Sequence, residues 1–118
     1  MTIEQCYAAI GGSYAEVSRR LPGQHLVEKF CRKFPDDQSY AELIAAAAAG
    51  DRDTAFRAAH TLKGVAANLA FTELQAKVSA LTEQLRPQTA QADAALLAEV
   101  EKAYALVVDT INAYKAEK

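Results

Sequence analysis

Apolar residues recur along this chain at intervals of three and four positions, the spacing that gathers side chains on one face of an α-helix. The C-terminal stretch predicts one long helix over about 89–116, and residues 72–85 predict the helix before it. No stretch alternates apolar and polar residues for long, so we expect no β-strand. The apolar stripes of these two helices are Leu97, Val100, Tyr104, Val107, Ile111 and Tyr114, and Leu74, Val78, Leu81 and Leu85.

Polar capping residues, glycines and prolines mark where the helices begin and end. Ser13 with Glu16, and Thr72 with Gln75, have the spacing of a capping box, and Asp51 suits the N-cap of a helix through 56–71. Pro22 suits the first turn of a helix whose apolar stripe is Leu26, Phe30 and Phe34, with Val27 and Cys31 beside it. Asp36 or Asp37 can cap a further helix, which stops at Gly50.

The predicted fold is all-α, an antiparallel up-down four-helix bundle with short additional N-terminal helices, because short connections make successive helices antiparallel neighbours. The 118 residues fit a single domain, 1–118, with a core bundle over about 22–116. A hydrophobic content of 51% with 24% charged residues is typical of a globular chain.

Net charge, terminal sequence and cysteine content limit which cellular compartments and which classes of partner fit this chain. The formal net charge of −2 gives no basic field for nucleic acid or an acidic membrane. The N-terminus lacks the basic and apolar regions of a secretory signal, and no apolar run is long enough to span a membrane. Cys6 and Cys31 are far apart and form no CxxC motif, so we expect reduced thiols in a cytoplasmic protein.

The stretch around His60 carries the candidate chemistry. At about 100° per residue, the side of the helix opposite His60 consists of apolar residues that should face the core. These are Ala55, Ala58, Leu62, Val65 and Leu69. The side that shares the direction of His60 should be open, and it consists of Asp53, Phe56, Arg57, Lys63, Gly64 and Ala67.

An exposed imidazole is a good nucleophile near neutral pH, because the ring is then largely uncharged. Lys63 could stabilise a phosphoryl group on that ring, and Gly64 and Ala67 leave room for another protein. A glycine inside a helix costs about 1 kcal/mol relative to alanine, which suggests a steric reason for Gly64. The alternatives are a solvated histidine beside an ordinary surface lysine, with Phe56 packed against the preceding helix.

The run AHTLKGVAANL, residues 59–69, resembles the signature of the histidine-containing phosphotransfer (HPt) family. The resemblance covers about 22–116 and implies a helical bundle in which His60 accepts a phosphoryl group, Lys63 stabilises it and Gly64 lies beside it. It implies exchange with receiver (response-regulator) domains and with a sensor or hybrid histidine kinase of a bacterial-type two-component phosphorelay. The surface for these partners would be Arg57, Lys63, Gly64, and the apolar edge near Phe56 and Ala67.

Two positions depart from the family pattern. The family commonly has glycine where this chain has Ala70, and alanine costs about 1 kcal/mol there if the residue is left-handed. Many members have glutamine at the position that we align with Thr82, whose hydroxyl could instead hydrogen-bond the phosphoryl group.

Other classes of function fit the sequence less well. The chain has no nucleotide-binding motif, so we expect a phosphoryl carrier without an ATP site of its own rather than an enzyme. Only His25 and His60 are present, and neither has the Glu-x-x-His spacing of a bundle metal site, so we expect no metal and no cofactor. The alternative is a helical interaction or adaptor bundle that is not phosphorylated. We expect a monomer.

Overall fold

The computed structural model describes residues 1–117, which contain seven α-helices, one short 3₁₀ helix and no strand. The all-α prediction is therefore confirmed. The elements are α1 (Ile3–Ala9), α2 (Tyr14–Arg20), α3 (Gln24–Lys33), η1 (Phe34–Asp36), α4 (Ser39–Ala49), α5 (Arg52–Asn68), α6 (Thr72–Gln84) and α7 (Ala94–Ala116).

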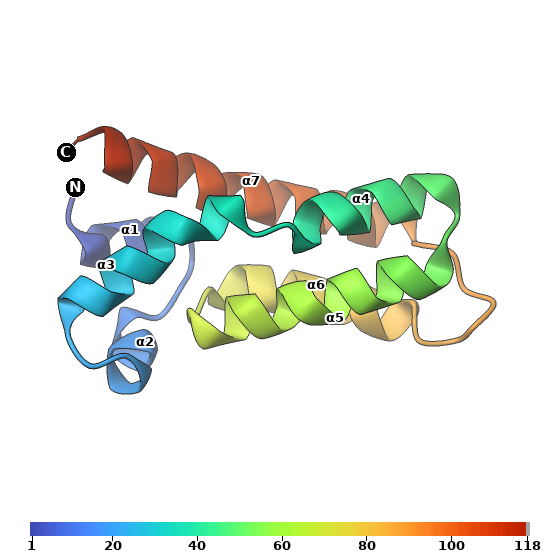
Figure 1. Cartoon of the computed structure of the whole chain (residues 1–118), viewed down its shortest axis with the longest axis horizontal. Coiled ribbons are helices and arrows are strands. Elements are labelled where there is room, and N and C mark those ends of the chain that lie inside the picture. The colour runs from blue at the N-terminus through green and yellow to red at the C-terminus, as the bar shows by residue number, and fades with distance from the viewer. Residues whose placement is uncertain (118) are drawn as a thin grey trace.

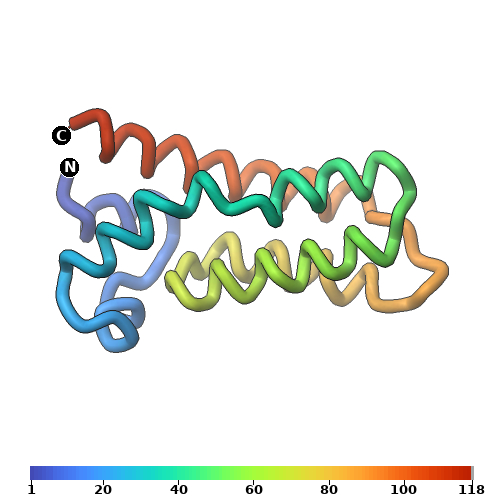
Figure 2. The backbone as a smooth tube through the Cα atoms, in the orientation of Figure 1, coloured from blue at the N-terminus to red at the C-terminus, as the bar shows by residue number. Residues whose placement is uncertain are grey.

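The four longest runs of helix lie side by side, and each runs opposite to the one before it in the chain (Figure 1). Helix α5 packs against both α4 and α6, and α6 packs against α7. Helices α3 and η1 continue roughly along the line of α4 and contact α7, so that α3, η1 and α4 together form one side of the molecule (Figure 2). Residues 1 and 117 meet at the end of the molecule that carries α1, where the amino group of Met1 pairs with Glu117.

The predicted apolar stripes of the last two helices form much of the core. All four stripe residues of α6 are buried, and in α7 the buried ones are Val100, Val107, Ile111 and Tyr114. Leu97 and Tyr104 are half-buried, and the Tyr104 ring stacks on Tyr40 with 3.7 Å between ring centroids. Both cysteines are free and buried, and burial raises the pKa of Cys31 to about 11.

Several predicted boundaries are confirmed by the capping contacts. The Ser13 hydroxyl accepts a hydrogen bond from the Glu16 backbone at 3.1 Å, and the Asp51 carboxylate accepts one from the Thr54 backbone at 3.2 Å. Gly50 ends α4 in the left-handed conformation, with φ +72°.

Three predictions along the chain were wrong. The last helix begins at Ala94 rather than near residue 89, because Asp93 caps it and a turn from Pro87 precedes it. Pro22 lies before the N-cap Gly23 and not in the first turn of α3. The face of α3 that enters the core is centred on Val27 and Cys31, whereas Phe30 is exposed.

The capping box predicted for Thr72 and Gln75 was also wrong. Thr72 is the first residue of α6, and its hydroxyl donates to the Ala70 carbonyl at 3.4 Å. The backbone N–H of Glu73 donates instead to the carbonyl of Gly11, at 3.2 Å. A free N–H at the start of a helix can be satisfied by any acceptor, and here the acceptor comes from a segment sixty residues away.

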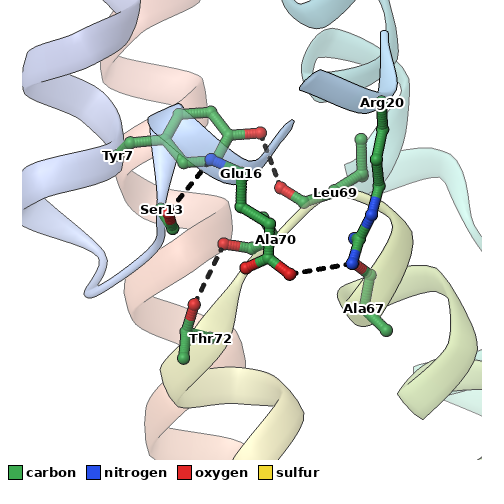
Figure 3. A network of polar contacts seen from close by, with 8 residues as sticks. All are labelled: Tyr7, Ser13, Glu16, Arg20, Ala67, Leu69, Ala70 and Thr72. Atoms are coloured by element: carbon green, nitrogen blue, oxygen red, sulfur yellow. Dashed lines mark hydrogen bonds and ion pairs between the residues drawn. The ribbon is translucent and has the colours of Figure 1, made fainter. Parts of the chain in front are cut away.

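The N-terminal segment, residues 1–21, packs against the turn between α5 and α6 and donates hydrogen bonds to the backbone carbonyls of that turn (Figure 3). The Tyr7 hydroxyl donates to the Leu69 carbonyl at 2.7 Å, and the Ser13 N–H donates to the Ala70 carbonyl at 2.9 Å. The Arg20 guanidinium donates to the Ala67 carbonyl. A side chain on Gly12 would place its Cβ 2.8 Å from the Ala70 oxygen, so glycine is required for this close approach. The turn thus depends on partners from outside α5 and α6.

Ala70 adopts the left-handed conformation, with φ +55°, which is the case in which the sequence predicts alanine to be costly. A left-handed alanine is strained by about 1 kcal/mol or more. Ala70 is also buried, and its carbonyl accepts the hydrogen bond from Ser13. The N-terminal segment therefore helps to hold this turn in its strained form.

Tyr7→Phe should lower the free energy of unfolding by about 1–2 kcal/mol, because the buried Leu69 carbonyl loses its donor while the aromatic packing stays. Burial raises the pKa of Tyr7, so its hydroxyl remains a donor throughout the ordinary pH range. Urea denaturation measures the change. Tyr14→Phe is the matched control, because within residues 1–117 the Tyr14 hydroxyl forms no hydrogen bond. Equal stability of the Tyr7 variant and the wild type would contradict the role given to this contact.

Candidate functional site

Helix α5 presents one face to solvent and buries the others. Its first turn is fixed by Asp51, and hydrogen bonds from Thr54 hold the pKa of that carboxyl below its ordinary value. The residues predicted to face the core are buried, except that Val65 is half-buried. Ala59 and Ala66 are buried as well, because α5 has neighbours on two sides.

The structure brings the predicted site residues together on the remaining face of α5. Asp53, Arg57, His60 and Gly64 are exposed, and Phe56, Lys63 and Ala67 are half-buried. The His60 ring lies beside Phe56, with 6.5 Å between the ring centroids and 22° between the ring planes. Within residues 1–117 the imidazole forms no hydrogen bond, so the ring is available to an external group.

Two cations on this face are available to an anion. Among residues 1–117, neither Lys63 nor Arg57 forms an ion pair within 4.0 Å. Lys63 lies one turn after His60 along α5, and Arg57 lies one turn before it. The geometry therefore places positive charge on both sides of the imidazole.

Gly64 has open space where a side chain would be. A Cβ built on this residue meets no atom of the described chain within 4 Å, apart from its own neighbours and the backbone of α5. Its backbone is helical, so no left-handed conformation requires glycine. Packing among residues 1–117 therefore does not account for this glycine.

Sequence reasoning missed Arg52 and Arg86, which surround Phe56. The two guanidinium carbons lie 4.7 Å and 5.4 Å from the centre of the Phe56 ring. Arg52 also donates from Nε to the Leu85 carbonyl at 2.7 Å, and it donates to the Arg86 carbonyl. These bonds tie the start of α5 to the end of α6. The spacing of Glu83 and Arg86 predicts a local ion pair, but only tertiary packing brings that pair beside α5.

The structure argues against the phosphoryl contact suggested for Thr82. The side chain is fully buried, and its hydroxyl donates to the Val78 carbonyl of its own helix at 2.8 Å. A group attached to the exposed His60 would not meet a hydroxyl that is turned into the core. We therefore leave Thr82 out of the site.

Neither a metal-binding cluster nor a membrane-spanning helix is present within residues 1–117. This range holds no cluster of three or more His, Cys, Asp or Glu side chains that could bind a metal ion. None of its helices combines the length and the apolar character needed to cross a membrane.

Comparison with known proteins gave one match. The family model described as Hpt domain matches residues 25–110, which include all of α4, α5 and α6 and most of α7. No curated protein and no solved structure matches the chain significantly. Residues 1–24, with α1 and α2, lie outside the matched region.

Gly64→Ala should raise the free energy of unfolding by up to about 1 kcal/mol, because helix propensity improves at a position with no steric conflict. Gly64→Gln should fold equally well for the same reason. Thermal unfolding followed by circular dichroism measures both.

Gly12→Ala is the contrasting variant, since its Cβ would clash with the Ala70 carbonyl, and it should lower the melting temperature. A lower melting temperature for both Gly64 variants would show that the bundle itself needs this glycine.

Proposed function

The chain belongs to the Hpt domain family, and from this premise we propose that it carries a phosphoryl group on His60 between partners of a two-component phosphorelay. Hpt domains act in histidine phosphotransfer and are phosphoryl carriers rather than kinases. One observation carries the assignment to His60. Within the matched region, an exposed imidazole stands on α5 with a free cation one turn away and an open glycine beside it.

The proposed step is attack by a ring nitrogen of neutral His60 on the phosphorus of a receiver's aspartyl phosphate. The N–P bond forms from the nitrogen lone pair, and the P–O bond breaks with its electron pair leaving on the aspartate. The ring gains a positive charge, and it becomes neutral again when the other ring nitrogen loses its proton. Transfer to a second receiver is the same step in reverse, so His60 carries the group without consuming ATP itself.

Lys63 and Arg57 supply the electrostatics of this proposal. Hydrogen bonds between a cation and phosphoryl oxygens are stronger than neutral ones, and neither cation has an ion-pair partner within residues 1–117 to give up first. A cation beside the ring stabilises the phosphoryl group both during the transfer and on His60 afterwards.

The docking surface for a receiver is the exposed face of α5. Gly64 and Ala67 let the partner's backbone approach the imidazole, while Phe56 and Arg57 provide an apolar and a charged contact at the other end. Receiver domains have an acidic pocket around their aspartate, which complements the two cations. Such contacts are transient and small, which suits a carrier that must leave one partner for the next.

The proposed partners are receiver domains and a sensor or hybrid histidine kinase of bacterial type. We place the exchange in the cytoplasm, because two free thiols are usual in a reducing compartment. We propose a monomer, which leaves the α5 face open to these partners.

His60→Gln should abolish the transfer of label from a receiver domain carrying a radioactive phosphoryl group, while the helical circular dichroism spectrum stays unchanged. The reason is that glutamine lacks the nucleophilic ring nitrogen. His25→Gln is the matched control and should accept label normally, because His25 lies on α3, outside the His60 face. Equal labelling of the His60 variant and the wild type would rule out His60 as the carrier.

Lys63→Ala should slow phosphoryl transfer about tenfold or shorten the lifetime of the phosphohistidine, because one charge-assisted contact is lost. Quenched-flow transfer kinetics and the decay of isolated labelled protein give the two numbers. Lys63→Arg should retain most of the activity, and Lys102→Ala, an exposed lysine on α7, should change neither number. If Lys63→Ala behaves like the Lys102 variant, Lys63 is only a solvated residue near His60 and does not stabilise the phosphoryl group.

A further inference from the structure

Beside the His60 face lies an ion pair between Glu83 of α6 and Arg86, which follows that helix, and the sequence did not place it there. The Arg86 guanidinium binds Glu83 through two hydrogen bonds, with Nε–Oε1 at 3.1 Å and Nη2–Oε2 at 2.7 Å. The same guanidinium lies over the Phe56 ring, which in turn lies beside the His60 ring. Both charged side chains are more than half exposed, at 58% and 61%. The pair thus stands at the edge of the site, in contact with solvent.

Glu83 acts on more than its own ion pair. The hydrogen bond from Arg86, followed by the charges of Arg86 and Lys63, holds the pKa of Glu83 below its ordinary value. Glu83 is thus a carboxylate near two of the cations that face the site. It remains ionised at neutral pH, where it opposes the positive charge that a phosphoryl group on His60 would meet.

We propose that Glu83 is a charge-balancing and positioning residue of the phosphotransfer site. It holds Arg86 over Phe56 and offsets the positive charge around His60, so that the phosphoryl group is held weakly enough to be passed on. This inference rests on the proposed function, because it concerns the stability of a phosphoryl group on His60.

A carrier needs a bound state of intermediate stability. If the cations around His60 acted without opposition, the phosphohistidine would be favoured over the aspartyl phosphate of the next receiver, and the group would stay on this protein. A nearby carboxylate lowers that preference by direct repulsion and by occupying Arg86. An exposed ion pair contributes little to folding, so we expect Glu83 to act through its charge rather than through stability.

The directions in which two substitutions change the phosphohistidine lifetime distinguish charge balance from a structural role. Glu83→Gln and Arg86→Gln break the same ion pair, so a merely structural pair predicts changes in the same direction. Charge balance predicts opposite directions, because one variant removes a negative charge from the site and the other removes a positive one. The measured quantities are the lifetime of phosphohistidine in the isolated full-length protein and the equilibrium division of label between this protein and a receiver domain.

We expect Glu83→Gln to lengthen the lifetime and to shift the division of label toward this protein, each by about threefold, and Arg86→Gln to do the reverse. Both effects should shrink when the salt concentration is raised from 0.05 to 0.5 M, because the screening length becomes roughly threefold shorter. Glu73→Gln is the matched control. It makes the same change in net charge on the same helix, ten residues or about 15 Å from Glu83, and it should alter neither quantity.

Changes in the same direction for the Glu83 and Arg86 variants, or an effect of Glu73→Gln equal to that of Glu83→Gln, would overturn this proposal while leaving the carrier function intact. The proposal would also be overturned if the wild type accepts label and the Glu83 and Arg86 variants show the same phosphohistidine lifetime as the wild type. A wild type that accepts no label from a phosphorylated receiver would overturn the carrier function, and this inference with it.

Discussion

The structure depends on one helix that is packed on two sides by small side chains and left bare on a third. Four of the alanines of α5 are buried, and they allow α4 and α6 to approach it closely. Bulkier residues there would push the neighbouring helices apart, and a buried third side would cover His60. The alanine-rich composition of this helix is thus a condition for an exposed imidazole on a rigid support.

Both ends of α5 are held by hydrogen bonds from outside the helix, so that His60 lies between two fixed points. At its start, the Arg52 side chain donates to the carbonyls of Leu85 and Arg86, which directly follow α6. At its end, Tyr7, Ser13 and Arg20 satisfy carbonyls of residues 67–70 (Figure 3). A reacting group gains from being held in a defined orientation, and for the proposed role of His60 these contacts supply that orientation without touching its face of α5.

The sequence predicted those features that local patterns determine. The stripes of α6 and α7, the Asp51 cap and the outward direction of His60 all follow from spacing or from backbone chemistry. The capping contacts at the start of α6 could not be predicted in this way, because the Glu73 N–H donates to the carbonyl of Gly11, a partner distant in sequence. The place of Arg86 next to Phe56 depends on how two helices pack, and the burial of Thr82 depends on the rotation of α6 about its axis.

The N-terminal segment behaves as a tethered ligand of the α5–α6 turn. Residues 1–21 lie outside the region that the family model matches, yet they donate to and accept from backbone groups within it. A ligand joined to its site by a short chain acts at a high effective concentration, so the turn remains bound although each contact alone is weak. Cleaving the chain after α2 would turn this intramolecular equilibrium into an ordinary association that dilution reverses. When the cleaved segment dissociates, its binding free energy no longer contributes to the stability of the domain that carries His60.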